Sequence, residues 1–176
     1  MSSAVSSRVV VAWWQLPAAA VLAAIAFVAV GRDPRVLPLV YLAAVTPALS
    51  AIDVLERRLP DRLVLPGYLV ASAAIVAHWI VSGEFGIVAI VSGAVYFVFM
   101  LAFGLAGGMG MGDVKLAGVL GLSAGLVSAT AAVVSPLVAF LLGGIAAIGA
   151  LRSARGASIP FGPFLLAGFW VAVVVG

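Results

Sequence analysis

Residues 107–115 read GGMGMGDVK and interrupt a long apolar sequence with four glycines and two charged side chains. The carboxylate of Asp113 directly follows these glycines, and Lys115 carries the other charge of the stretch. A second carboxylate, Asp53, closes an earlier, largely apolar run that begins at Val45. Ionisable groups at membrane depth are costly, and they usually face a protein interior or a water-filled cavity. We therefore expect the chain to be organised around these two aspartates.

The composition indicates an integral membrane protein. Of the 176 residues, 65% are hydrophobic and 9% are charged, and the mean hydropathy is +1.33. A soluble domain has roughly 45–50% apolar and about 25% charged residues, so this chain has too little polar surface to coat a water-soluble particle. The net charge of +3 is best explained as a topology signal, and no nucleic-acid partner is expected. The sequence has no cysteine and one histidine, so no metal site and no cofactor are expected.

The apolar segments predict an all-α bundle of six or seven transmembrane helices in a single domain, residues 1–176. A helix that crosses the bilayer needs about 20 mainly apolar residues. Seven ranges are candidates: 9–30, 36–52, 64–81, 86–106, 114–134, 136–151 and 160–175. The first range also has features of a cleaved signal sequence, although its length favours a retained helix. Ser135-Pro136 is the predicted break between the fifth and sixth helices.

The distribution of basic residues predicts the orientation. If the N-terminus is cytoplasmic and there are seven spans, seven of the nine Lys and Arg residues fall on the cytoplasmic side. Asp53 and Asp113 then lie at the cytoplasmic ends of the second and fourth spans. A six-span arrangement keeps both aspartates on the same face.

The other polar candidates have ordinary interpretations. Asp33, Glu56 and Glu84 are expected to be solvated loop charges. Asp61 comes just before the third apolar range, where it is expected to cap the helix N-terminus. His78 lies within the third range and is expected to be a hydrogen-bonded packing residue.

Asp53 and Asp113 have plain alternatives as well. Asp53 has a potential ion-pair partner in Arg57, four residues on, and Asp113 has the position of a cap on the fifth helix. If the two aspartates instead meet, both cannot ionise cheaply and the pair holds a shared proton. Such a pair can activate water, because one carboxylate takes its proton while the other protonates the scissile carbonyl. This is the arrangement of an aspartic protease, which requires neither a metal nor a thiol.

Three segments resemble the type IV prepilin peptidases and their relatives, the preflagellin peptidases. Residues 110–113, Gly-Met-Gly-Asp, followed by Val-Lys, resemble the Gly-x-Gly-Asp signature of that family. Residues 53–63 are similar to its first aspartate motif, and residues 159–164 resemble a third family segment. The resemblance implies that Asp53 and Asp113 are the catalytic pair. From the residues themselves, Gly110 and Gly112 are expected as active-site backbone that lets the chain bring Asp113 toward Asp53. Lys115 has two equal interpretations, a charge that favours ionised Asp113 and a cytoplasmic topology charge, and Pro60 and Asp61 are the other candidates for a supporting role.

The resemblance also implies a reaction and its partners. The expected function is a membrane-embedded aspartic endopeptidase that removes the short basic leader of prepilin-like precursors, of type IV pilin, pseudopilin or Flp/Tad type. The site would face the cytoplasm from the cytoplasmic membrane. The expected partners are a prepilin-like protein substrate and the lipid bilayer, and a homo-oligomer is left open. Longer family members carry paired Cys-x-x-Cys motifs that support methylation of the product. Since this chain has no cysteine, we expect the short form without a methyltransferase region.

Two other classes of function stay open on the residues alone. The first is a small proton-coupled transporter or channel that uses Asp53 and Asp113 as a polar relay. The second is a non-catalytic subunit of a pilus or secretion machine, with both acids as helix caps. A relay requires ionisable groups staggered through the membrane, whereas these two are expected near one face.

Overall fold

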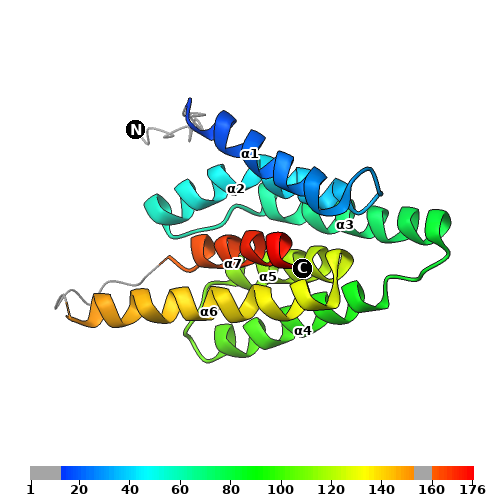
Figure 1. The fold of residues 1–176 in the computed structure, drawn as a ribbon. Coiled ribbons are helices and arrows are strands. Elements are labelled where there is room, and N and C mark those ends of the chain that lie inside the picture. The colour runs from blue at the N-terminus through cyan, green and yellow to red at the C-terminus, as the bar shows by residue number, and fades with distance from the viewer. Residues whose placement is uncertain (1–12, 153–159) are drawn as a thin grey trace, which may run out of the picture.

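The computed structural model describes residues 13–152 and 160–176, and every regular element in these ranges is an α-helix. The helices are α1 (Gln15–Val30), α2 (Val36–Glu56), α3 (Asp61–Ser82), α4 (Ile87–Leu105), α5 (Met111–Val127), α6 (Ala129–Arg152) and α7 (Gly162–Val175) (Figure 1). The all-α prediction is therefore confirmed. Residues 9–12 of the first predicted range lie outside the described residues.

Several of these helices suit a bilayer by length and composition. In the described ranges, four are long and apolar enough to cross it, namely α2, α3, α4 and residues Ala129–Gly149 of α6. Helices α1 and α7 are apolar but shorter. The chain is a multi-pass helical membrane protein.

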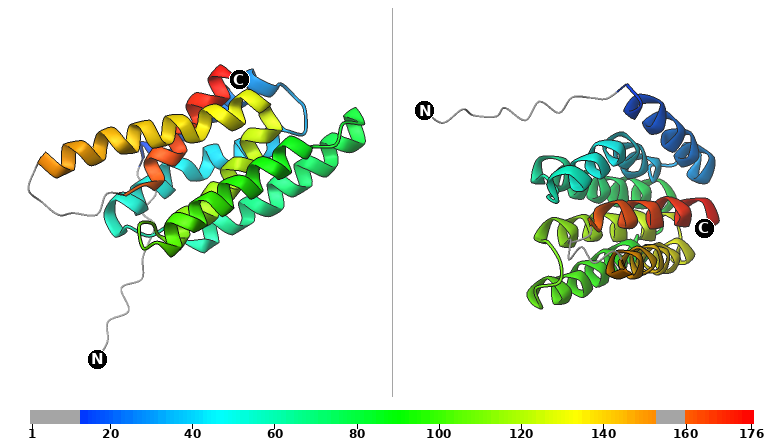
Figure 2. Two further views of the ribbon diagram at one scale, coloured as in Figure 1. Left: turned by 90° about the horizontal axis from the view of Figure 1, so that it is seen from below. Right: turned by 90° about the vertical axis from the view of Figure 1, so that its left-hand side faces the viewer.

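The chain runs back and forth, so that alternate helix ends gather at two opposite ends of the bundle (Figure 1). The last turns of α2, α4 and α6 lie beside the first turns of α3, α5 and α7, on the left in Figure 1. Seen along the helix axes, α5 and α7 lie between α2 and α3 on one side and α4 and α6 on the other (Figure 2, right). Helix α5 contacts α3, α4, α6 and α7, and most of its residues are buried. The central helix therefore carries Asp113 in its first turn.

The break between α5 and α6 lies seven residues earlier than predicted. Helix α5 ends at Ser128, whose backbone is extended and whose Oγ accepts a hydrogen bond from the N–H of Ala131 at 2.9 Å. This is the N-cap geometry of a serine at the start of a helix. Pro136 lies inside α6, where its missing N–H frees the carbonyl of Ala132. The hydroxyl of Tyr96 on α4 donates to that carbonyl, so a neighbouring helix satisfies the freed group.

Helix α2 continues beyond its predicted end. It runs to Glu56, and Arg57 ends it in the left-handed conformation with φ 52°. As a result Asp53 lies within the last turn of α2 and not after it. The helix also continues through Pro47.

Helix α4 ends in a Schellman motif. Gly107 has φ 79°, the N–H of Gly107 donates to the carbonyl of Gly104, and that of Gly108 donates to the carbonyl of Phe103. A positive φ favours glycine. Gly107 is therefore the glycine of this stretch that the backbone conformation requires, and it turns the chain from α4 toward α5.

Candidate active site

Asp53 lies in the last turn of α2 and is 4% exposed. Its Oδ2 accepts a hydrogen bond from the backbone N–H of Gly162, the first residue of α7, at 2.9 Å. The expected alternative for Asp53, an ion pair with Arg57, does not occur among the described residues. Arg57 is exposed, and its backbone N–H bonds the carbonyl of Asp53 at the end of the helix.

Asp113 is the third residue of α5, after the N-cap residue Gly110. Its Oδ1 is buried and has no hydrogen-bond partner in the described part of the chain. Its Oδ2 faces Gly110, where a Cβ would lie 3.5 Å away. A buried polar atom without a partner costs free energy, and such atoms call for an explanation such as a catalytic role.

The two aspartates share one pocket of about 530 Å³. It is lined by the end of α2, the α2–α3 loop and the start of α5, with Asp53 and Asp113 among its residues. The two carboxyl groups are close enough to interact electrostatically. Both aspartates therefore lie at one end of the bundle, and no direct hydrogen bond between their carboxyl groups is present among the described residues.

The loop residue Leu59 lines the pocket and packs against the start of α5. It is 8% exposed, and a Cβ on Gly112 would lie 2.9 Å from the Cβ of Leu59 and 3.3 Å from its backbone N and O. Glycine at position 112 thus allows the start of α5 to approach the α2–α3 loop this closely. Gly110 lines the pocket, but its φ of −75° and ψ of 146° suit any residue. The backbone at Gly110 therefore does not require glycine, and the turn between α4 and α5 is made at Gly107.

The supporting residues join α3 to α5 by two sets of polar contacts, Lys115 with Asp61 and Tyr68 with the backbone of Lys115, which we call the tie between α3 and α5. Lys115 contacts a different aspartate from the one that the sequence suggested: its Nζ donates to both carboxylate oxygens of Asp61 at 2.8 Å. Asp61 is the first residue of α3 and does not cap it, because Pro60 occupies the N-cap position. The hydroxyl of Tyr68 donates to the backbone carbonyl of Lys115 at 2.8 Å. These bonds hold the start of α5, and with it Asp113, against α3.

Sequence reasoning missed the role of Gly162. Residues 159–164 were singled out for their resemblance to a family segment and received no place in the site, and Ile159 lies outside the described residues. The hydrogen bond to Asp53 spans 109 residues of sequence. Local patterns do not reveal such a pairing, although a Gly-Pro pair at the start of an apolar helix indicates a helix N-terminus near the membrane surface.

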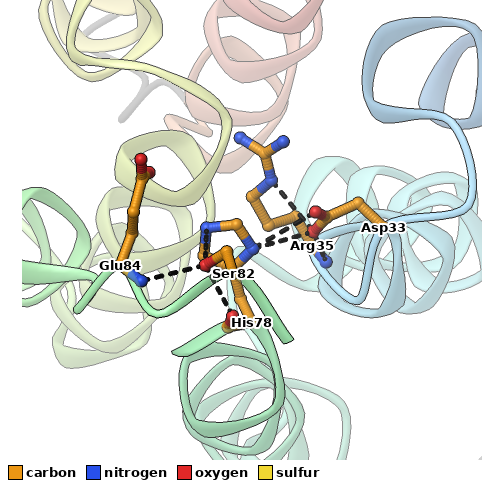
Figure 3. Close-up of polar contacts among 5 residues, drawn as sticks. All are labelled: Asp33, Arg35, His78, Ser82 and Glu84. Carbon is orange, nitrogen blue, oxygen red and sulfur yellow. Dashed lines mark hydrogen bonds and ion pairs between the residues drawn. The ribbon is translucent and has the colours of Figure 1, made fainter. Parts of the chain in front are cut away.

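A second polar cluster lies at the opposite end of the bundle (Figure 3). His78, on α3, is 8% exposed; its Nδ1 lies 3.1 Å from Oδ1 of Asp33, and its Nε2 lies 3.3 Å from Oγ of Ser82. The expectation of a hydrogen-bonded packing histidine is confirmed. Asp33 is not the solvated charge that was expected, because it also accepts bonds from the N–H and Nε of Arg35 at 2.9 and 3.0 Å.

The surroundings of Asp33 stabilise its ionised form. Burial alone would raise its pKa, but the hydrogen bonds from Arg35 and the charges of Arg35 and His78 together hold the pKa of Asp33 below its ordinary value of 3.8. Glu84 borders this cluster through its backbone N–H, which donates to Oγ of Ser82 at 3.1 Å, while its own side chain points away in Figure 3. In the described ranges no three His, Asp or Glu side chains lie close enough together to hold a metal ion.

Comparison with known proteins identifies the family. Residues 40–151 match the model of the type IV leader peptidase family. Two curated relatives named prepilin leader peptidase/N-methyltransferase are similar: that of Stutzerimonas stutzeri is 36% identical over 139 residues, and that of Pseudomonas putida is 34% identical over 137. Each match covers 73% of this chain and 46% of the relative, so the chain spans about half the length of these relatives. No solved structure matches significantly. The matched range includes both aspartates, and the chain belongs to the type IV leader peptidase family.

Proposed function

We propose that this chain is a membrane-embedded aspartic endopeptidase that removes the leader from prepilin-like precursors, with Asp53 and Asp113 as its catalytic pair. The observation that carries the proposal is the common pocket of the two aspartates, which come from α2 and α5. Membership of the type IV leader peptidase family supports the substrate class, as does the similarity to the two prepilin leader peptidase/N-methyltransferases.

The proposed reaction needs only the two carboxyl groups and one water molecule. The ionised carboxylate takes a proton from water, and the resulting hydroxyl attacks the scissile carbonyl carbon. The protonated carboxyl gives its proton to the carbonyl oxygen as the tetrahedral intermediate forms. When the C–N bond breaks, the carboxyl group that took the proton from water gives it to the leaving amine, while the other carboxylate takes a proton from a hydroxyl of the intermediate, which becomes the carbonyl of the new C-terminus. The pair then holds one proton again. Each peptide bond cleaved therefore consumes one water.

The charges around the pocket support a cytoplasmic orientation for the proposed site. Four basic residues lie at the same end as the aspartates: Arg57, Arg58, Arg62 and Lys115. Arg35 lies at the opposite end, in the cluster around Asp33. An excess of Lys and Arg in short loops marks the cytoplasmic side. We accordingly propose that the pocket opens toward the cytoplasm.

A co-expression assay tests the proposal. The full chain is expressed with a tagged prepilin-like substrate, and processing is followed as a decrease in substrate size with the new N-terminus identified by mass spectrometry. Asp53→Asn and Asp113→Asn preserve side-chain volume, and each is expected to abolish processing while the protein still inserts in the membrane. Asp33→Asn, at the opposite end of the bundle, serves as the matched control and is expected to process normally.

Two outcomes contradict the proposal. Processing that persists in either pocket variant rules out the aspartate pair. Proton flux in liposomes that depends on both aspartates, without cleavage of any substrate offered, indicates a transporter instead.

A further inference from the structure

The start of α7 contacts Asp53 directly. The N–H of Gly162 donates to Oδ2 of Asp53 at 2.9 Å, and both residues are buried. The first N–H groups of a helix have no partner within the helix, and they are oriented toward anions. Asp53 therefore satisfies one of the free N–H groups of α7, and the start of α7 stabilises a negative charge on Asp53.

The contact requires a glycine. A Cβ on Gly162 would lie 2.8 Å from Oδ2 and 3.2 Å from Cγ of Asp53, and 3.4 Å from Cδ2 of Leu59. Any side chain at this position must push the carboxylate away or withdraw the helix. The close approach, and not an unusual backbone angle, is thus what selects glycine here.

Contacts two turns away prevent α7 from withdrawing. Nε1 of Trp170 donates to Oγ1 of Thr46 on α2 at 3.0 Å, and Phe169 beside it is fully buried. The bonds from Trp170 to Thr46 and from Gly162 to Asp53 join the same two helices, so α7 is fixed along α2 at two points. The N–H of Gly162 is consequently held at the Asp53 carboxylate.

We infer that Gly162 is a positioning residue of the proposed reaction: its N–H orients the Asp53 carboxylate toward the pocket and favours the ionised form of Asp53 over that of Asp113, which has no such bond on its buried Oδ1, so that Asp53 serves as the base. Asp113, whose buried Oδ1 has no hydrogen-bond partner in the described residues, is then the member that carries the proton. This inference rests on the proposed function. It adds α7 to a site otherwise lined by α2, the α2–α3 loop and the start of α5.

A kinetic comparison of two glycine variants tests the positioning role. In Gly162→Ala the displaced carboxylate is expected to lower kcat at least about tenfold while KM stays within about twofold, because only the reacting group moves. Gly168→Ala is the matched control on the same helix: its Cβ would lie 2.5 Å from the carbonyl oxygen of Ser135, so it crowds α6 away from the aspartates. It is expected to lower thermal stability and leave kcat unchanged. Wild-type kcat in Gly162→Ala, or equal losses in both variants, overturns the inference.

A second measurement depends neither on activity nor on the folding of the alanine variants. Carbonyl-13C phenylalanine and 15N glycine select the Phe–Gly amides of the full chain, of which there are three, at residues 85–86, 103–104 and 161–162. Asp53→Asn is expected to move one of these NMR signals, because the acceptor of the Gly162 N–H changes, whereas Asp33→Asn leaves all three in place. If none moves in Asp53→Asn, the inference falls even where cleavage is observed. If one moves but the wild-type chain cleaves no prepilin-like substrate, the proposed function fails and the inference fails with it.

Discussion

Asp33 and Asp113 lie at opposite ends of the same bundle and have opposite surroundings. Asp33 accepts hydrogen bonds from Arg35 and lies against His78, so its charge is matched on two sides (Figure 3). Asp113 interacts with a second carboxyl group, and one of its oxygens is buried without a partner in the described residues. The first arrangement stabilises the fold, whereas the second costs free energy.

This difference separates a structural acid from a candidate catalytic one. A carboxylate that is already hydrogen-bonded to neighbouring side chains is not free to bind and activate a substrate. A pair that shares a pocket retains both a proton and a lone pair for chemistry. The comparison also suggests that the ties around the pocket, from Lys115, Tyr68 and Gly162, compensate for the unfavourable proximity of Asp53 and Asp113.

Among variants that leave both aspartates and Gly162 in place, the largest effect is expected where the start of α5 packs against the α2–α3 loop. Gly112→Ala places a Cβ 2.9 Å from the Cβ of Leu59, so the α2–α3 loop must shift. We expect a loss of about 1–3 kcal/mol in the free energy of unfolding and at least a tenfold fall in cleavage rate, since Asp113 is the next residue. Thermal unfolding in detergent and a peptide cleavage assay measure the two effects.

Gly144→Ala is the matched control for this variant. It lies on α6, where a Cβ meets nothing within 4 Å, and alanine is the better helix former. Its stability and cleavage rate are expected to equal or exceed those of the wild type. Equal behaviour of the two alanine variants would show that the contact with Leu59 has no role.

A smaller effect, confined to stability, is expected at the opposite end. Asp33→Asn removes a charge that Arg35 and His78 stabilise, which is expected to cost about 1 kcal/mol at pH 7 without changing the cleavage rate. Because the pKa of Asp33 is held below its ordinary value of 3.8 in the folded state, its contribution is present above that pH and is lost as the pH falls through the folded-state pKa. The melting temperatures of wild type and variant are thus expected to converge below about pH 4. A constant difference from pH 7 to pH 3 contradicts this account.

The smallest effect is expected at the partly exposed tie between α3 and α5. Lys115→Met removes the ion pair with Asp61, whose side chains are 31% and 53% exposed, and such pairs contribute about 0.5 kcal/mol. The bond from Tyr68 to the backbone of residue 115 remains, so cleavage is expected to fall less than about tenfold. Tyr68→Phe tests the other half of the tie. If Lys115→Met abolishes cleavage in a folded protein, Lys115 acts in the reaction and not only in the tie.

The sequence predicts the features that depend on local composition. Long apolar ranges give the helices, and charge next to apolar sequence identifies Asp53 and Asp113 as exceptional. The break between α5 and α6 was misplaced because proline is a strong helix breaker in water, whereas here Tyr96 satisfies the carbonyl that Pro136 frees. In the structure Ser128 caps the start of α6 instead.

The contacts between distant segments were beyond sequence reasoning. The bond from Gly162 to Asp53 and the pairing of Lys115 with Asp61 join residues 109 and 54 positions apart. A single sequence contains no signal that selects these partners from others of the same type. The histidine was recognised as a packing residue, yet its acidic partner, Asp33, was expected to be in solvent.

A double-mutant cycle on the two aspartates tests the central claim most directly. Cleavage of one prepilin-like peptide is measured with purified wild type, Asp53→Asn, Asp113→Asn and the double variant, all at equal folded concentration. If the two carboxyl groups act as one unit, each single variant loses about 10²–10⁴-fold in rate and the double variant is no slower than either. Independent losses that multiply in the double variant, or a single variant that cleaves at the wild-type rate, would contradict the account.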